Sequence, residues 1–142
     1  MGPRARFLAV CLAAAVFSAT AAATLRWDEL PPLPDPAGVA GPFVGVHGDA
    51  LIVAGGANFP EPRWETQKAF HDRVHVLLRE TAGGSTAYRW VEGPPLARPL
   101  AYGACASTPQ GVVCAGGNDA ERVYADAFLL TWDAAKKTVV TT

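Results

Sequence analysis

Two apolar runs, each ending in a double glycine, dominate the pattern of hydrophobic and polar positions in this chain. The first is LIVAGG at residues 51–56, and the second is VVCAGG at residues 112–117. A polar loop follows each run and leads into a second apolar run, at residues 74–78 or 128–130. A strand that ends in Gly-Gly predicts positive φ angles, or a close approach where a Cβ atom would clash. The repetition therefore predicts two copies of one small β-sheet unit.

A hairpin is predicted at the start of each unit. Residues 43–47 and 51–54 are apolar and joined through Gly48-Asp49, a two-residue hairpin signal. Residues 102–107 and 112–115 match them around Pro109-Gln110. Counting outward from that second turn places Cys105 opposite Cys114. Opposed residues have Cα atoms about 4.5–5.5 Å apart, which is within disulfide range. Either a cross-strand disulfide or a pair of free thiols that pack as small apolar groups is compatible with the sequence.

Tryptophans followed by prolines indicate the outer strands. Residues 25–29 carry Trp27 and lead into LPPLP, as residues 88–91 carry Trp90 and lead into GPPL. Trp90 and Trp132 each follow a third strand, so we expect them to recur as packing residues between units. An inner hairpin, a third strand and an outer strand are typical of a kelch-type propeller blade. We therefore predict an all-β fold, a kelch-type β-propeller fragment of about two antiparallel four-stranded blades.

The first 23 residues have the pattern of a secretory signal peptide. Arg4 and Arg6 precede an apolar run at residues 7–17, and three alanines end the segment. A membrane anchor is the alternative, but a spanning helix needs about 20 apolar residues and this run is shorter. We expect cleavage near Thr24, no membrane association afterwards, and a periplasmic or secreted protein.

The remaining chain is predicted to be a partial ring. A propeller closes with about four to eight blades, so residues 24–142 are too few for a complete one. We interpret the chain as the N-terminal part of a longer polypeptide. Its expected parts are a closing outer strand at 24–34, a first blade at 38–96 and an incomplete second blade at 97–142.

Charge excludes one class of partner. The chain has 142 residues, with 12 Lys and Arg, 13 Asp and Glu, and a net charge of −1. There is no basic stripe, so no nucleic-acid partner is expected. No Cys, His and Asp spacing indicates a metal site, and no nucleophile is accompanied by a base.

Several linked motifs resemble one known family. They are GVAGPFVGV at residues 38–46, GGANFP at 55–60, the segment 64–72, and AYG at 101–103 leading to AGG at 115–117. Together they resemble N-acetylneuraminate epimerases, the sialic acid mutarotases, and most of all the cyclically permuted branch of that family. The resemblance implies a six-bladed kelch ring, of which this chain covers about a third. The Glu and Arg usually proposed as catalytic in the family have no matching motif here.

The resemblance also implies a reaction. The α and β anomers of N-acetylneuraminate, a sugar acid, would be interconverted by acid–base ring opening, and no cofactor is required. We expect this activity in a full-length parent and not in the fragment. The alternative is a non-catalytic kelch module that binds glycans or proteins, because a fold does not fix an activity.

The candidate site residues lie on loops that should open on one face of the propeller. Arg or Lys would bind a sugar carboxylate and an indole would stack on the sugar ring, although Arg63 and Lys68 also fit as solvated loop charges. His71 is a weak candidate acid or base. Asp72 and Asp126, at one repeat position, are expected to fix the loop before the third strand. The substrate-binding candidates are Asn58, Arg63, Trp64, Lys68, Arg98 and Tyr102, and the structural ones are Gly55, Gly56, Asp72, Gly116, Gly117 and Asp126.

Overall fold

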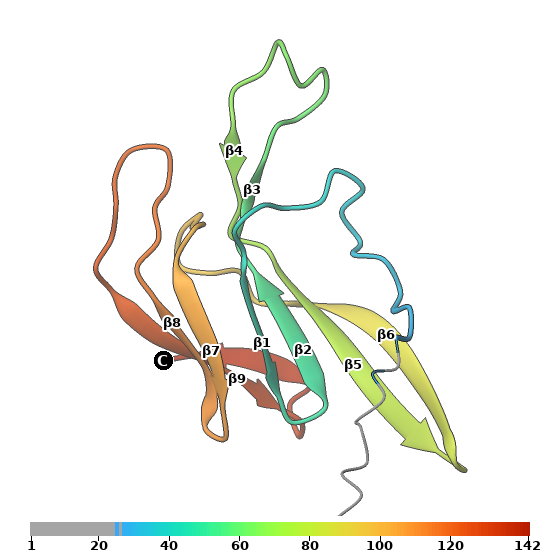
Figure 1. The fold of residues 1–142 in the computed structure, drawn as a ribbon. Helices are drawn as coiled ribbons and strands as arrows, with labels where there is room; N and C mark the ends of the chain where they lie inside the picture. Colours follow the sequence, from blue (N-terminus) through green and yellow to red (C-terminus); the bar gives the residue numbers. More distant parts are fainter. Residues whose placement is uncertain (1–24, 26) are drawn as a thin grey trace, which may run out of the picture.

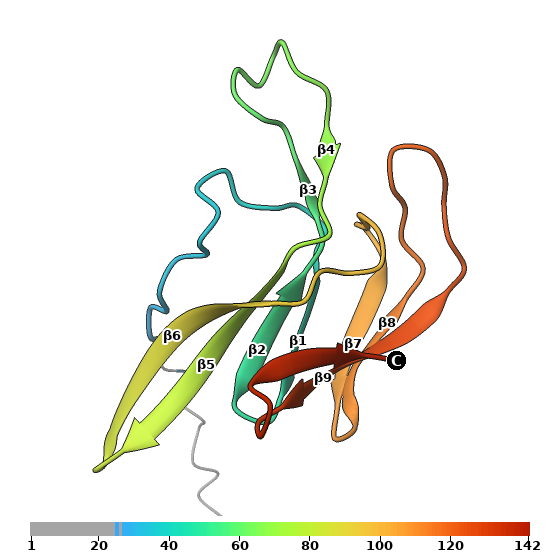
Figure 2. The same cartoon turned by 180° about the vertical axis from the view of Figure 1, so that it is seen from behind.

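In the computed structural model, the described residues form two four-stranded antiparallel sheets and a two-stranded ribbon. The structure describes residue 25 and residues 27–142. The predicted signal peptide at residues 1–23 lies outside the described residues. The two sheets lie side by side, and the ribbon projects beyond one end of them (Figure 1; Figure 2 shows the reverse side).

The first sheet is the predicted first blade. Its strands run in the order β1-β2-β5-β6. The pairing of His47 with Ala50 confirms the Gly48-Asp49 hairpin. The last two strands extend beyond the apolar residues that predicted them, because they continue as an exposed hairpin that turns at Gly83-Gly84. The strands are β1 (Phe43–His47), β2 (Ala50–Ala54), β5 (Val74–Ala82) and β6 (Ser85–Gly93).

The second sheet also has four strands, and the expected division of the chain into a closing strand, a first blade and an incomplete second blade stays a prediction. The order is β10-β9-β8-β7. A turn at residues 134–137 folds the chain back, which lets Val139 pair with Trp132. Thr108 pairs with Gly111, which confirms the Pro109-Gln110 turn. The strands are β7 (Ala104–Thr108), β8 (Gly111–Ala115), β9 (Ala127–Asp133) and β10 (Thr138–Thr141).

The hydrophobic core lies between the two sheets. Phe43, Ile52 and Val76 of the first sheet and Val112 and Leu130 of the second are buried in a single cluster. The cluster residues alternate along the strands, as Val74, Val76 and Leu78 of β5 show, so they lie on one face of the sheet. His75 and Leu77 are buried as well, on the opposite face of β5. The core therefore joins two successive blades rather than filling either one.

The inner strands β1 and β7 are joined by side chains. Strand β1 is an edge of its sheet, and an edge strand presents unpaired backbone groups. Val46 N donates to Ser107 Oγ at 2.8 Å, and Val44 N donates to Cys105 Sγ at 3.2 Å. Two side chains of β7, two residues apart, thus accept hydrogen bonds from backbone N–H groups at the edge of the neighbouring blade.

The segment before the first blade is not a strand in its described part, residues 25 and 27–34. Trp27 is exposed, while the Trp90 indole donates to Pro31 O at 3.1 Å and ties the segment to β6. The predicted closing strand requires a partner from a later blade. No described strand supplies one, so the closing role stays a prediction.

Two apparent repeats are out of register. Trp90 lies on the fourth strand β6, opposite Leu77, whereas Trp132 lies on the third strand β9, opposite Val139. The predicted equivalence of the two tryptophans is therefore wrong. Its cause is that β9 runs further than its apolar residues indicate, which places Trp132 in the third strand itself.

The two aspartates also occupy different repeat positions. Gly55 N donates to Arg73 O, and the corresponding Gly116 N donates to Asp126 O, both at 2.8 Å. Asp126 therefore corresponds to Arg73, and Asp72 lies one residue earlier in its blade. The prediction of a shared position is wrong by one residue, because the loops before β5 and β9 differ in length and cannot be aligned by residue type.

Candidate functional site

The double glycines turn the chain from the second strand of each blade into a loop on the common face. Gly55 and Gly116 have φ angles of 69° and 68°, and Gly56 and Gly117 have φ angles of 100° and 101°. The predicted positive φ is thus present in both blades. Glycine adopts this region without the steric cost that a Cβ atom adds.

A short backbone bridge follows each double glycine. Ala40 and Ala57 exchange hydrogen bonds of 2.7 and 2.9 Å, and Ala101 and Asn118 exchange equivalent bonds of 2.9 and 2.8 Å. Each bridge ties the crossover that enters a blade to the loop that leaves its second strand. The crossovers and loops are therefore held together at fixed, repeating positions.

A cavity of about 410 Å³ opens beside the first bridge. The loop that carries the ribbon β3 (Ala57–Asn58) and β4 (Ala69–Phe70) forms one wall, and the crossover before β1 forms another. A single residue from the next crossover, Tyr102, completes the lining. Four of the six predicted substrate-binding residues line this cavity, namely Asn58, Arg63, Lys68 and Tyr102.

Lys68 is held between two aromatic rings at this cavity. Its Nζ lies 5.0 Å from the centroid of the Tyr102 ring and 5.7 Å from that of Phe59. An ammonium within about 6 Å of a ring centroid is attracted by the ring's negative face. Sequence reasoning missed Phe59, because only the fold brings it next to Lys68.

Asn58 and His71 form a bridge across the base of the ribbon. His71 Nε2 lies 2.8 Å from Asn58 Oδ1, and Asn58 Nδ2 donates to Gly38 O at 2.8 Å. Both ends of the Asn58 amide are therefore engaged with the protein, although one N–H remains for a ligand. His71 is not part of the cavity lining.

The second blade carries the counterpart of this bridge. His71 N donates to Gly56 O and Tyr124 N donates to Gly117 O, so His71 and Tyr124 occupy equivalent positions. The Tyr124 hydroxyl donates to Asp119, the residue that corresponds to Asn58. This bond, together with backbone N–H donors, lowers the pKa of Asp119 to about 2. The repetition indicates that the Asn58–His71 contact closes the loop, which supplies a structural account of His71.

Arg63 and Trp64 lie at the exposed tip of the same loop. Arg63 Nε binds Glu61 Oε1 at 2.9 Å, and both side chains are more than half exposed. Trp64 is 96% exposed and is not among the lining residues. The stacking indole that the sequence predicts is therefore absent from the cavity, where the rings of Phe59 and Tyr102 are present instead.

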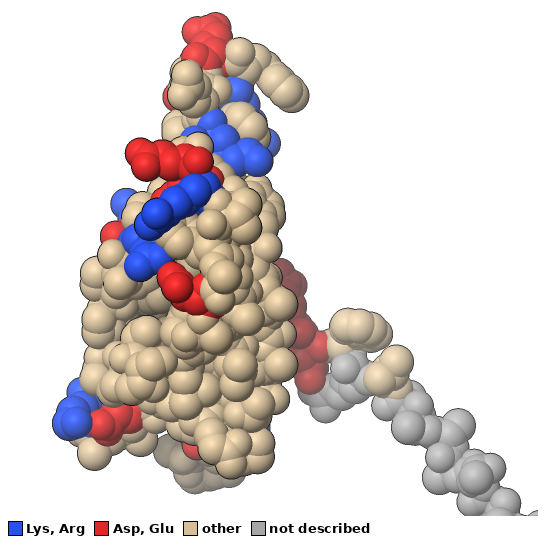
Figure 3. All heavy atoms as spheres, turned by 90° about the vertical axis from the view of Figure 1, so that its left-hand side faces the viewer, with Lys and Arg blue, Asp and Glu red and all other residues tan. Residues whose placement is uncertain are grey.

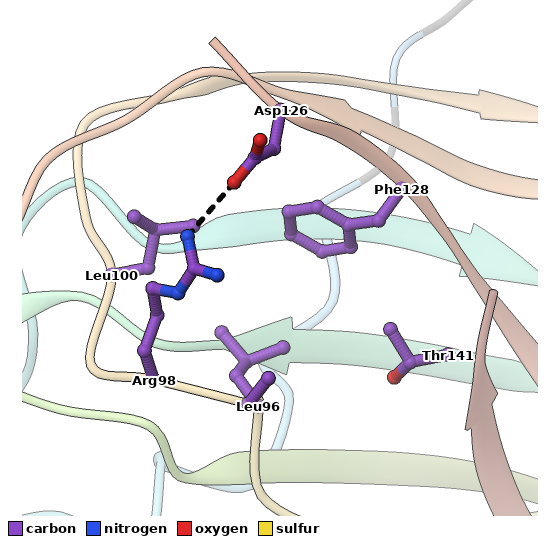
Figure 4. Close-up of a pocket in the computed structure, with 7 residues that line it drawn as sticks. Leu96, Arg98, Leu100, Asp126, Phe128 and Thr141 are labelled. Carbon is purple, nitrogen blue, oxygen red and sulfur yellow. Dashed lines mark hydrogen bonds and ion pairs between the residues drawn. The ribbon is translucent and has the colours of Figure 1, made fainter. Parts of the chain in front are cut away.

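Arg98 lies at a different cavity, of about 160 Å³, between the two blades. Figure 4 shows its guanidinium pointing toward Asp126, with Nη1 and Oδ2 2.8 Å apart, and Leu96, Leu100 and Phe128 lining the same cavity. Its guanidinium carbon also lies 4.5 Å from the Tyr124 ring centroid. The structure therefore does not bring Arg98 together with the other candidates.

The predicted opposition of Cys105 and Cys114 is confirmed by the strand register. Both thiols are free, so the disulfide alternative is absent from this structure. Cys105 Sγ instead donates to Val44 O on the neighbouring blade, at 3.3 Å. Cys114 is buried, and burial raises the pKa of its thiol to about 12.

Charged side chains of both signs gather toward the loop end of the molecule, above a largely uncharged sheet (Figure 3). Within residues 25 and 27–142, no group of three or more His, Cys, Asp or Glu side chains has a metal-binding arrangement. Across the same described part of the chain, no helix is long and apolar enough to span a membrane.

No family model matches the chain, but several individual proteins of one name do. N-acetylneuraminate epimerase from Brucella suis is 36% identical over 113 residues, which are 75% of this chain and 29% of the relative. The epimerase from Brucella melitensis is 37% identical over the same extent. The Escherichia coli enzyme of that name is 31% identical over 120 residues, covering 81% of this chain and 32% of its own length.

A solved structure described as "Structure of YjhT" also matches. Its TM-score is 0.69 at 25% identity, over 86% of this chain and 36% of that one. The likeness confirms the fold class, with two antiparallel blades that match part of a kelch-type propeller. The chain spans about a third of the length of the relatives that it matches.

Proposed function

Because its homologues are N-acetylneuraminate epimerases, we propose that this chain is part of a protein that interconverts the α and β anomers of N-acetylneuraminate. The homology over 75–81% of the chain is the observation that carries this proposal. The whole protein would need the blades that correspond to the rest of the relatives' length. We further propose that the segment at residues 1–23 directs export to the periplasm or beyond, as its pattern predicts.

The chemistry of the 410 Å³ cavity supports a sugar acid as its ligand. A carboxylate is matched by the cations of Lys68 and Arg63. The apolar face of a pyranose is matched by the aromatic residues Phe59 and Tyr102, which are 44% and 46% exposed. The remaining Asn58 N–H would donate to a hydroxyl or to the N-acetyl oxygen. Arg63 would contribute less than Lys68 to binding of the carboxylate, because the ion pair with Glu61 already occupies one edge of the Arg63 guanidinium.

Anomer interconversion needs two proton transfers. A base removes the proton from the anomeric hydroxyl, an acid protonates the ring oxygen, and closure on the other face of the carbonyl carbon gives the second anomer. None of the described residues that line the cavity is Asp, Glu or His. The described residues at this cavity would therefore bind and orient the sugar, while the groups that move protons would come from other blades.

A cavity whose residues bind the sugar without transferring protons also favours a second candidate function, a non-catalytic kelch module that binds glycans or proteins. The observation behind it is that the described lining residues include no Asp, Glu or His. The two candidates differ in one measurable property, which is the rate of anomer exchange with the whole protein present.

The test starts from crystalline N-acetylneuraminate, which dissolves as one anomer. Proton NMR then follows equilibration in buffer, with residues 24–142 alone, and with the whole protein. One positioned acid or base typically contributes a factor of order 10²–10⁴. The proposal expects the whole protein to accelerate equilibration by at least the lower of these factors, and residues 24–142 to match buffer. A buffer rate with the whole protein would overturn it, and binding without acceleration would favour the module.

A further inference from the structure

Gly41 and Tyr102 occupy the same repeat position and share an unusual backbone conformation. Each follows a bridging alanine, Ala40 in the first blade and Ala101 in the second. Their φ angles are 60° and 62°. The fold therefore demands a left-handed residue here in both blades. In the first blade this residue is a glycine, whereas in the second blade it carries a large aromatic side chain.

A left-handed conformation costs an L-residue roughly 1–2 kcal/mol, and such outliers persist where the surroundings fix them. Tyr102 is fixed on both sides. Ala101 is held by its bridge to Asn118, and Tyr102 N donates to Gly41 O at 2.7 Å. The next residue is a glycine whose Cβ would overlap the Phe43 ring. Glycine would satisfy all these backbone contacts without strain, so they do not explain the aromatic side chain.

The contacts of the Tyr102 ring account for an aromatic side chain at this position. The ring lies against Gly41, where a Cβ atom would overlap ring carbon Cδ1 and lie 2.8 Å from Cε1. It forms a T-shaped pair with Phe70, with centroids 6.2 Å apart and an interplanar angle of 82°. Its face lies under the Lys68 ammonium at 5.0 Å. The ring thus reaches from the second blade into the cavity of the first and touches the only lysine lining it.

We propose that Tyr102 is a positioning residue, which holds the Lys68 ammonium at the cavity where the carboxylate of the sugar acid binds. Gly41 is needed for this position of the Tyr102 ring, because any larger residue would displace the ring. The proposal rests on the proposed function for the identity of the ligand. It goes beyond that function by assigning the selectivity for an acid over a neutral sugar to a contact between two blades.

The experiment compares three variants of the whole protein. Tyr102→Gly removes the ring and relieves the backbone strain, and Tyr102→Phe keeps the ring face. Lys137→Gly is the matched control, because Lys137 is the other described non-glycine residue with positive φ, at 53°, and lies away from the cavity. The readouts are KM and kcat for anomer exchange, and binding of N-acetylneuraminate relative to its methyl ester.

Tyr102→Gly is expected to raise KM about fivefold with kcat changed less than twofold, since a partly exposed cation–aromatic contact has about that effect on affinity. The preference for the acid over the ester should also fall, by no more than the rise in KM, because the lost contact between ring and sugar weakens binding of acid and ester alike. Tyr102→Phe should restore most of this preference, and Lys137→Gly should change neither quantity. An unchanged KM in folded Tyr102→Gly protein would overturn the proposal, as would equal losses for acid and ester.

A second readout does not depend on activity. With ¹³C-labelled lysine, the ε-CH₂ protons of Lys68 should resonate upfield of those of Lys136 and Lys137 because of the Tyr102 ring current. This shift should largely disappear in Tyr102→Gly. Its absence in the wild-type protein would overturn the positioning role. Its presence without any anomer exchange or sugar binding would overturn the proposed function and leave the ring–ammonium contact established.

Discussion

Replacing Gly55 by alanine tests whether the double glycine is required for close approach or for its φ angle alone. A Cβ at Gly55 would overlap the Leu100 carbonyl oxygen, and lies 3.2 Å from Leu96 Cδ1. Gly116 has nearly the same φ, yet its Cβ would meet nothing closer than Tyr124 O at 3.6 Å. The two positions therefore share the conformational cost and differ in the clash.

The magnitude follows from these contacts. Both Gly→Ala changes carry the left-handed cost of about 1–2 kcal/mol. Gly55→Ala must also push away the Leu100 carbonyl, which accepts a 2.8 Å hydrogen bond from Gly56 N. Leaving such a buried donor unpaired costs about 1–3 kcal/mol. We expect Gly55→Ala to lower the free energy of unfolding by about 3 kcal/mol, and Gly116→Ala by about 1 kcal/mol.

The assay is urea unfolding of the whole protein, followed by tryptophan fluorescence and by circular dichroism. Coincident transitions would justify a two-state treatment, and similar m-values would permit direct comparison of midpoints. Destabilisation of the two variants by equal amounts, within about 0.5 kcal/mol, would refute the steric part of the reasoning.

Three further predictions concern the cavity, the thiols and the isolated chain. Lys68→Ala should raise KM for anomer exchange at least tenfold, because it removes a charge-assisted contact, whereas Trp64→Ala should change KM less than twofold. In native protein Cys105 should react with a thiol reagent, and Cys114 should react only on unfolding. Because the folded pKa of Cys114, about 12, exceeds the unfolded value near 8.5, stability should fall as pH rises from about 9 to 12, and a Cys114→Ala variant should lose that dependence. Residues 24–142 alone should aggregate, since Val44, Val46 and Val113 are exposed; a monodisperse monomer by light scattering would contradict this.

Local patterns in the sequence predicted the inner and third strands of both blades, both hairpins and the double-glycine loops. They did not predict the ribbon β3–β4, and the strand expected at residues 25–29 is not a strand in its described part. The predicted features depend on neighbouring residues, because strand burial has a period of two and a two-residue turn fixes its own register. The opposition of Cys105 and Cys114 follows from the same arithmetic. Matching residues of the two blades by residue type gave wrong equivalences, because the blades can be aligned only from their strand pairing and hydrogen bonds. Trp132 and Asp126 were matched to Trp90 and Asp72, yet hydrogen-bond partners place them elsewhere.

The cavity was predicted in part for a similar reason. Asn58, Arg63 and Lys68 share one loop, so residue type and loop position were enough to group them. Tyr102 meets Lys68 only after two blades pack, and Phe59 meets Lys68 only once their shared loop folds back on itself. No sequence spacing encodes either contact. The left-handed conformation of Tyr102 is also invisible in the sequence, because positive φ normally signals glycine or asparagine.

The most direct test of the central claim, that this cavity receives the sugar acid, is a crystal structure of the whole protein with N-acetylneuraminate bound. We expect the sugar carboxylate within about 3 Å of Lys68 Nζ, as charge-assisted hydrogen bonds require. We also expect contact between the sugar and the rings of Phe59 and Tyr102. A sugar bound with its carboxylate on other residues, and with the Lys68 cavity empty, would contradict the account.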